Sequence, residues 1–424
     1  MKNFLFSPNL KRRLFLRGSL FAASLWLSSI LFDKSQSTEP PLSVTTSELV
    51  SNNTAFALDL YRYLSSESGN LFFSPYSISI ALAMTYAGAR EETAIEMAEV
   101  LKFSLSPDRL HPTFADLRSI LEANATEDYQ LAIANRLWGQ ADYPFLERFL
   151  ELIQSYYGSG LETVDFFKET EAARQTINTW VEQQTNGKIK DLLAPNILSP
   201  LTQLVLTNAI YFKAKWLEPF RPDLTQEEPF TIAPGQQISV PMMKGTTSVS
   251  NYVVLGDVKL LELFYLTMQQ SMVIILPDRV DGLARLEQRL TPSLLAEWLA
   301  ALDKDNSPFK FPLTTWLPKF KVSSELELKK TLTALGMTNA FGLNANFSGM
   351  DGGITPPIYL QNIIHKAFVD VNELGTEAAA ATGVVAGIRS SRGSIIIDRP
   401  FLLLIRDIKS GSILFIGRVV NPLS

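Results

Sequence analysis

The stretch LVLTNAIYF, residues 204–212, constrains the fold most, because almost all of its side chains are apolar and suited to a β-strand. A strand that is apolar on both faces is typical of a sheet covered on both sides. With 46% hydrophobic and 19% charged residues, a chain of 424 residues can bury such a strand in a large core. We therefore expect one large globular domain around this strand.

Apolar periodicity elsewhere predicts both helices and strands. Helical spacing is found over residues 46–66, 76–102, 114–123 and 171–186. Strand patterns are found over residues 258–266, 271–276, 316–322 and 363–371, and turn formers join residues 401–406 to 412–420 as a hairpin. Because most of the helices precede most of the strands, the predicted class is α+β with antiparallel sheets.

The N-terminal residues 1–37 differ from the remainder of the chain. They carry six basic residues and one acid, and an apolar stretch at 18–32 follows the paired Arg12 and Arg13. This pattern resembles a twin-arginine export signal, so we expect the protein to be exported to the periplasmic or extracellular space. The alternative is an uncleaved membrane anchor at 18–32, although a membrane span usually needs about 20 residues. No A-x-A cleavage site follows.

The remaining composition argues against several classes of function. There is no cysteine, which excludes disulfides and a cysteine nucleophile. The net charge of −5 would be more negative without residues 1–37, which disfavours nonspecific binding of nucleic acid. The two histidines are His111, expected at the surface beside Pro112, and His365 in a strand-like run. No metal-binding or hydrolase motif is present, so we expect no enzyme, no metal and no cofactor, and a hydrolase using His365 is the rival.

The segment ELGTEAAAATGVVAGIRSSRG, residues 373–393, has an unusual composition for its place before the C-terminal hairpin. A flexible loop or a short alanine-rich helix is one interpretation. As a strand, however, the segment would place Thr376, Ala378, Ala380 and Thr382 on one face, where all the side chains are small and uncharged. Such a face could enter the middle of a sheet without overpacking it. No proline interrupts the segment, so every backbone donor is available to such a sheet.

Five motifs together resemble the serpin family over residues 46–424. They are NLFFSPYSISIALAMTYAGAREET (70–93), LTNAIYFKAKWLEPF (206–220), LPKFKV (317–322), HKAFVDVNELGTEA (365–378) and the hairpin region 398–422. The resemblance implies a serpin domain with three β-sheets surrounded by about nine helices. It also implies an exposed reactive-centre loop over residues 373–393.

The resemblance further implies which residues of the loop carry function. The hinge comprises Glu373, Gly375, Thr376, Glu377, Ala378, Ala379, Ala380, Ala381 and Thr382. Counting as in the family sets the scissile bond between Arg389 and Ser390, with Arg392 as a second candidate. An arginine at this position suits the acidic pocket of a trypsin-like serine protease. Arginine-specific cysteine proteases are the alternative target.

Residues outside the loop are assigned roles by the same resemblance. A hydrogen-bonded shutter beneath the main sheet is implied for Ser74, Ser77, Asn208 and His365. Trp216 would lie in the breach, where the loop first enters that sheet, and Lys319 would pair with Glu373. The alternatives are ordinary buried polar residues for the shutter and two solvated charges for Lys319 and Glu373.

The predicted function is inhibition of a trypsin-like serine protease through a covalent acyl-enzyme complex. We expect a monomer, and no polysaccharide activator, because the predicted helix 114–123 carries Arg118 as its single basic residue. The rival is a non-inhibitory serpin that acts as a ligand carrier or a folding factor.

Overall fold

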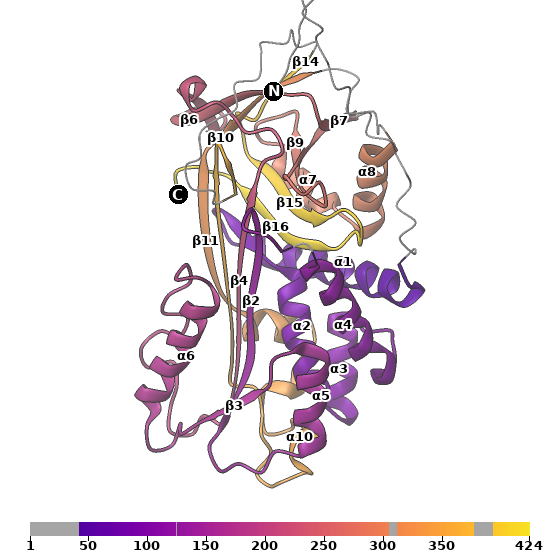
Figure 1. Ribbon diagram of the computed structural model, residues 1–424, viewed down its shortest axis with the longest axis vertical. Helices are drawn as coiled ribbons and strands as arrows, with labels where there is room; N and C mark the ends of the chain where they lie inside the picture. Colours follow the sequence, from indigo (N-terminus) through magenta and orange to yellow (C-terminus); the bar gives the residue numbers. More distant parts are fainter. Residues whose placement is uncertain (1–41, 124, 305–311, 377–392) are drawn as a thin grey trace, which may run out of the picture. The chain divides into compact units, whose positions relative to one another are not determined.

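The computed structural model describes residues 42–123, 125–304, 312–376 and 393–424 (Figure 1). Within these residues the chain forms three sheets, ten α-helices and two short 3-10 helices, η1 (Pro222–Leu224) and η2 (Asn339–Phe341). The α-helices are α1 (Val44–Leu64), α2 (Pro75–Tyr86), α3 (Glu91–Leu101), α4 (Pro107–Glu122), α5 (Glu147–Tyr157), α6 (Thr170–Gln184), α7 (Leu283–Arg289), α8 (Pro292–Lys304), α9 (Leu328–Ala334) and α10 (Ser348–Asp351). The predicted α+β class is confirmed.

The strand predicted to be covered on both sides lies inside a six-stranded sheet, here called the central sheet. The order of this sheet is β11 (Phe320–Glu327), β12 (Asn362–Asn372), β13 (Gly375–Thr376), β4 (Leu204–Lys215), β2 (Tyr129–Gln140) and β3 (Leu161–Val164). Every residue from 204 to 212 in β4 is buried, as the apolar run predicts.

Two further sheets complete the fold. The first has the order β1 (Leu71–Phe73), β16 (Ile413–Val419), β15 (Phe401–Asp407), β9 (Gln270–Pro277), β8 (Val258–Phe264) and β7 (Ser250–Leu255). Its strands β15 and β16 form the predicted C-terminal hairpin. The second has the order β14 (Gly393–Ile396), β10 (Leu313–Pro318), β6 (Gln236–Thr247) and β5 (Gln226–Ala233).

Helices cover both faces of the central sheet (Figure 1). On one face lies α2, with every residue from Pro75 to Thr85 buried, and α3, α4 and α5 pack around it. On the other face, α6 packs Ile177 and Val181 against Val205 and Ala209 of β4. The polar residues of the shutter lie between α2 and the sheet, so they are remote from solvent.

Three expectations about the elements are wrong. Two of the three sheets are mixed and not purely antiparallel, because β4 pairs with β12, β2 with β3 and β10 with β14 in parallel. The apolar run 316–322 is not one strand, since the chain changes sheets at Lys319, between β10 and β11. The helical pattern 76–102 is broken at residues 87–90. In that break, a Cβ on Gly88 would lie 2.1 Å from Met350 Cγ, so the backbone packs too closely for a larger residue.

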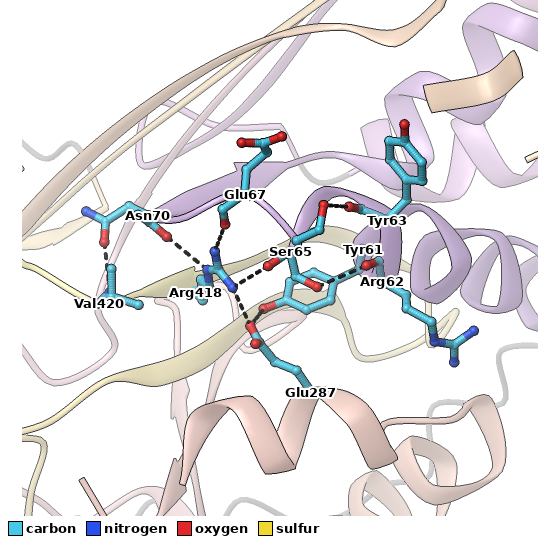
Figure 2. Close-up of polar contacts among 11 residues, drawn as sticks. Tyr61, Arg62, Tyr63, Ser65, Glu67, Asn70, Glu287, Arg418 and Val420 are labelled. Atoms are coloured by element: carbon cyan, nitrogen blue, oxygen red, sulfur yellow. Dashed lines mark hydrogen bonds and ion pairs between the residues drawn. The ribbon is translucent and has the colours of Figure 1, made fainter. Parts of the chain in front are cut away.

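A buried arginine ties the end of α1 to the C-terminal hairpin (Figure 2). The guanidinium of Arg418, on β16, donates hydrogen bonds to the carbonyls of Ser65, Glu67 and Gly69. It also pairs with the Glu287 carboxylate at 3.0 Å. Tyr61 donates its hydroxyl to the same carboxylate at 2.7 Å. The charge of Arg418 is therefore fully satisfied although the residue is buried.

Candidate functional site

The start of the predicted hinge lies within the central sheet. Thr376 pairs with Val371 of β12 and Ala214 of β4, and Gly375 pairs with the next residues along. The short strand β13 is antiparallel to both of its neighbours. Gly375 has φ +154°, and a Cβ there would lie 2.1 Å from the Ala214 carbonyl oxygen. The close approach of β4 therefore requires glycine at this position.

Trp216 holds the backbone that leads into β13. Its indole N–H donates to the Asn372 carbonyl at 3.0 Å, and its backbone N–H donates to the Leu374 carbonyl at 2.9 Å. The indole ring stacks on Tyr265, with centroids 4.7 Å apart. The Tyr265 hydroxyl shares a hydrogen bond with the Thr376 hydroxyl at 2.7 Å. Trp216 thus lies beside the start of β13.

Glu373 and Lys319 form an ion pair and are not two solvated charges. Lys319 Nζ lies 2.9 Å from one carboxylate oxygen of Glu373, and the Thr225 hydroxyl donates to the other at 2.8 Å. Burial raises the pKa of Glu373. Hydrogen bonds from Lys319, its own backbone N–H and Thr225 outweigh that effect and hold this pKa below its usual value. The carboxylate thus stays charged and fixes the first residue of the hinge.

The four predicted shutter residues meet in one buried network. His365 of β12 lies directly opposite Asn208 of β4. The Ser74 backbone N–H donates to His365 Nε2 at 3.1 Å, so the ring proton is on Nδ1, which donates to Asn208 Oδ1. The Asn208 amide in turn donates to the backbone and hydroxyl oxygens of Ser77 at 2.8 and 2.7 Å. The network therefore joins β12 to β4 and both strands to α2.

Asn135 is a further member of this network that is not predicted from the sequence. Asn135 lies on β2, directly opposite Asn208. Its Nδ2 donates to the Ser77 carbonyl at 3.0 Å, and its Oδ1 accepts from the Ser77 hydroxyl and from the Asn208 amide. A lone asparagine within the apolar run at residues 131–138 is a sequence signal for a buried polar contact. The strands predicted from the sequence do not include residues 131–138, so the contacts of Asn135 are not predicted.

Neither histidine is arranged as a catalytic base. Burial lowers the pKa of His365 to about 3, and its two ring nitrogens bond a backbone amide and a side-chain amide. The prediction that His111 lies at the surface is wrong, because only 3% of the residue is exposed. Helix α4 begins at Pro107 and includes Pro112 within it, which turns His111 inward, where Nδ1 bonds the Tyr157 hydroxyl at 2.6 Å. A hydrolase therefore has no support from the geometry.

Several predicted residues lie outside the described residues. They are Glu377, Ala378, Ala379, Ala380, Ala381, Thr382, Arg389, Ser390, Arg392 and the N-terminal segment 1–37. Where the chain is described, no group of three or more acidic or histidine side chains could hold a metal ion. No helix in those same ranges is both long and apolar enough to cross a membrane.

Fold and site together define a protein of the serpin class, with a loop that begins between two strands of its central sheet. A family model described as "Serpin (serine protease inhibitor)" matches residues 51–422, and the chain belongs to that family. It is 40% identical to the human leukocyte elastase inhibitor, over 88% of this chain and 100% of that protein. It is 38% identical to mouse antithrombin-III, over 88% and 82% respectively.

Solved structures agree with the family assignment. Human kallistatin superimposes with a TM-score of 0.80 and 30% identity, covering 90% of this chain and all of that one. Human thyroxine-binding globulin, complexed with thyroxine, superimposes with a TM-score of 0.79 and is 33% identical in sequence. The match again covers 90% of this chain and all of that one. The protein is therefore a serine protease inhibitor and not an enzyme, as the resemblance implies.

Proposed function

We propose that this serpin inhibits a trypsin-like serine protease, which attacks the bond between Arg389 and Ser390. Relatives include an elastase inhibitor and an antithrombin, so family membership leaves the target protease open. The residue before the scissile bond fills the specificity pocket of the protease. An arginine there fits an acidic pocket of the trypsin type.

One observation carries the proposal: β13 lies antiparallel between β12 and β4, which are parallel to each other. A longer strand continuing from Thr376 would replace the single parallel ladder by two antiparallel ladders. Antiparallel pairing is slightly more stable per residue, and each new strand residue adds backbone hydrogen bonds. Insertion of the cleaved loop is thus favourable, and the native state before cleavage is metastable.

The register of β13 defines where each loop residue would go. Continued along β4, it sets Ala380 opposite Ile210 and Thr382 opposite Asn208, and along β12 it sets Thr382 opposite His365. Ile210 belongs to the main hydrophobic core on the α2 side. The small face identified in the sequence would therefore enter that core, where side chains no larger than threonine avoid overpacking.

The same register gives the shutter a function in the mechanism. A new strand must move β12 and β4 from about 4.8 Å to about 10 Å apart. The hydrogen bond between His365 and Asn208 cannot span that distance, so insertion breaks it. The Thr382 hydroxyl would then face Asn208 and take over its contact. The shutter thus resists opening of the sheet until the loop supplies a replacement.

The covalent step determines when insertion occurs. The protease serine attacks the Arg389 carbonyl, the amine of Ser390 leaves as a new N-terminus, and an ester joins Arg389 to the protease. Residues 376–389 at about 3.3 Å each span about 46 Å, so insertion carries the attached protease far from its docking position. Distortion of the protease before water cleaves the ester completes the inhibition.

Incubation with trypsin, followed by a denaturing gel and mass mapping, tests the proposal. We expect a covalent complex and a released fragment that begins at Ser390. Arg389→Ala should lose the complex, and the matched control Arg392→Ala should keep it. A clipped chain without any complex would instead favour the non-inhibitory rival. The thermal midpoint of the cleaved chain should exceed that of the intact protein, and a midpoint no higher would refute metastability.

We also propose that residues 1–37 direct export. The paired Arg12 and Arg13 before an apolar stretch support it. In a bacterial host with a twin-arginine pathway, the Arg12→Lys, Arg13→Lys double variant should remain in the cytoplasm while the unaltered chain is exported. Equal export of both would contradict a twin-arginine signal.

A further inference from the structure

A cavity of about 520 Å³ opens among helices α2, α3, α4 and α5, which cluster on one side of the central sheet (Figure 1). It is lined by Tyr86 and Ala87 at the C-terminal end of α2, whereas the shutter residues Ser74 and Ser77 lie at the opposite end of that helix. A volume of this size is within the range of small-molecule sites. Neither the hinge nor the shutter uses this cavity.

The cavity contains a buried hydrogen-bond donor. His111 lines it and is 3% exposed. The buried hydroxyl of Tyr157 has His111 Nδ1 as its partner at 2.6 Å, and a buried phenol needs an acceptor, so the hydroxyl donates to Nδ1. The neutral ring then carries its proton on Nε2. This N–H has no partner within the described residues and is left for the cavity.

Positive charge acts at the same place. Arg90 lines the cavity, and its Nη1 donates to the carbonyls of Ala87 at 3.0 Å and Ala89 at 2.7 Å. Its Nε and Nη2 donors make no hydrogen bond in the part of the chain that the structure describes. Burial, and then the charge of Arg90, lower the pKa of His111 to about 4. The guanidinium of Arg90 therefore brings a positive charge to the lining of the cavity that also contains His111.

Two carboxylates also line the cavity, and each has another partner or is open to solvent. Glu91 accepts a hydrogen bond from the Asn346 amide at 3.0 Å, which directs its carboxylate toward Asn346. Asp108 lies in the first turn of α4 and is exposed.

The walls are aromatic and apolar. The ring centroids of Tyr86 and Tyr156 both lie 6.4 Å from that of His111. Ala94 and Leu152 supply apolar surface. A planar ring suits such walls, because aromatic rings bury large areas and pair favourably with one another.

We propose that this cavity binds a small aromatic carboxylate. One carboxylate oxygen accepts the Nε2–H of His111, and the guanidinium of Arg90 pairs with the anion. The aromatic ring lies against Tyr86 and Tyr156. Charge-assisted hydrogen bonds of this kind are stronger than neutral ones, so the acid binds better than its neutral amide.

Proton NMR of the full chain tests this site, with indole-3-acetate as the probe and indole-3-acetamide as its uncharged match. The chain has two histidines, so His365 is an internal control. The Cε1–H signal of His111 should shift saturably with the acid, and that of His365 should not. The amide should bind about tenfold more weakly, the size of effect expected for one charge-assisted contact.

Two variants separate binding from folding. Arg90→Gln should weaken binding of the acid by about tenfold and leave binding of the amide unchanged. Leu152→Trp, which fills the cavity, should abolish binding of both probes. Unaltered trypsin inhibition by each variant shows that it is folded. No shift of the His111 signal at millimolar acid would overturn the site, and equal affinities for acid and amide would overturn the carboxylate preference.

Discussion

Lowering the pH from 7.5 to 5.0 should destabilise the native protein through His365. The ring is fully buried, and burial lowers its pKa from 6.5 to about 3 in the folded chain. The unfolded chain binds a proton below pH 6.5, and the folded chain does not until about pH 3. The contribution of His365 to stability is therefore complete above pH 6.5 and falls steadily as the pH drops toward 3.

The magnitude follows from the difference in proton binding. Each pH unit below the pKa of the unfolded state lowers the free energy of unfolding by about 1.4 kcal/mol. Between pH 6.5 and 5.0, His365 therefore costs the folded protein about 2 kcal/mol of stability. His111, with a pKa of about 4, contributes a similar loss over the same interval. Because the chain has two histidines in all, two single variants separate their contributions.

Urea unfolding at several pH values measures these contributions. His365→Gln and His111→Gln should each lower stability at pH 7.5, since each loses buried hydrogen bonds. In each variant, the histidine-dependent slope of the free energy of unfolding against pH should fall by about half between pH 6.5 and 5.0. Proton NMR of the unaltered, tag-free protein reports the same titrations directly. We expect no histidine signal of the native state to titrate near pH 6.5.

The His365 signal is identified by its absence in His365→Gln. If it titrates near pH 6.5, burial does not keep this ring neutral in the native state, and the prediction is refuted. It would also be refuted if His365→Gln kept the full slope of the unaltered protein. A loss of slope in His111→Gln alone would assign the whole effect to α4 and not to the shutter.

Three further predictions concern the hinge and the shutter. Gly375→Ala should slow the formation of the protease complex, because its Cβ would lie 2.1 Å from the Ala214 carbonyl oxygen and displace the hinge; an unchanged rate in progress curves would contradict this. Thr376→Arg should turn the inhibitor into a substrate, since a fully buried position cannot hold an unpaired charge, whereas Thr376→Ser should still form the complex on a gel. Asn135→Leu should cost about 1–3 kcal/mol, because Ser77 and Asn208 lose a buried partner, and an unchanged urea midpoint would argue against that role.

Local pattern was sufficient to predict the class of fold and the buried run of β4. The apolar run of β4 and the hairpin of β15 and β16 depend on periodicity and turn residues, which a sequence displays directly. The break at Lys319 was not predictable in this way, because the residues on both sides are equally apolar. Which sheet each half joins depends on its partner strands, β6 for one and β12 for the other.

The candidate site was predicted through resemblance and not through spacing. Asn135, Asn208 and His365 are far apart in the sequence and meet because their strands align in register. Tyr265, which follows β8, contacts Thr376, and no local pattern connects the two residues. The inward turn of His111 is not predicted, because the residue precedes Pro112 in a polar stretch, whereas α4 continues through Pro112, its sixth residue, although proline cannot donate the backbone hydrogen bond there.

The contacts of Arg418 bear on how the chain is made. Its guanidinium closes the segment after α1 from a position 349 residues further along, and β1 gains its strand partner from the same hairpin. During synthesis, β1 cannot pair until β16, near the end of the domain, has left the ribosome. The buried side chains of β1 stay uncovered for that time, which favours help from chaperones. Nonsense mutations that remove residue 418 should therefore give aggregates rather than a shortened inhibitor.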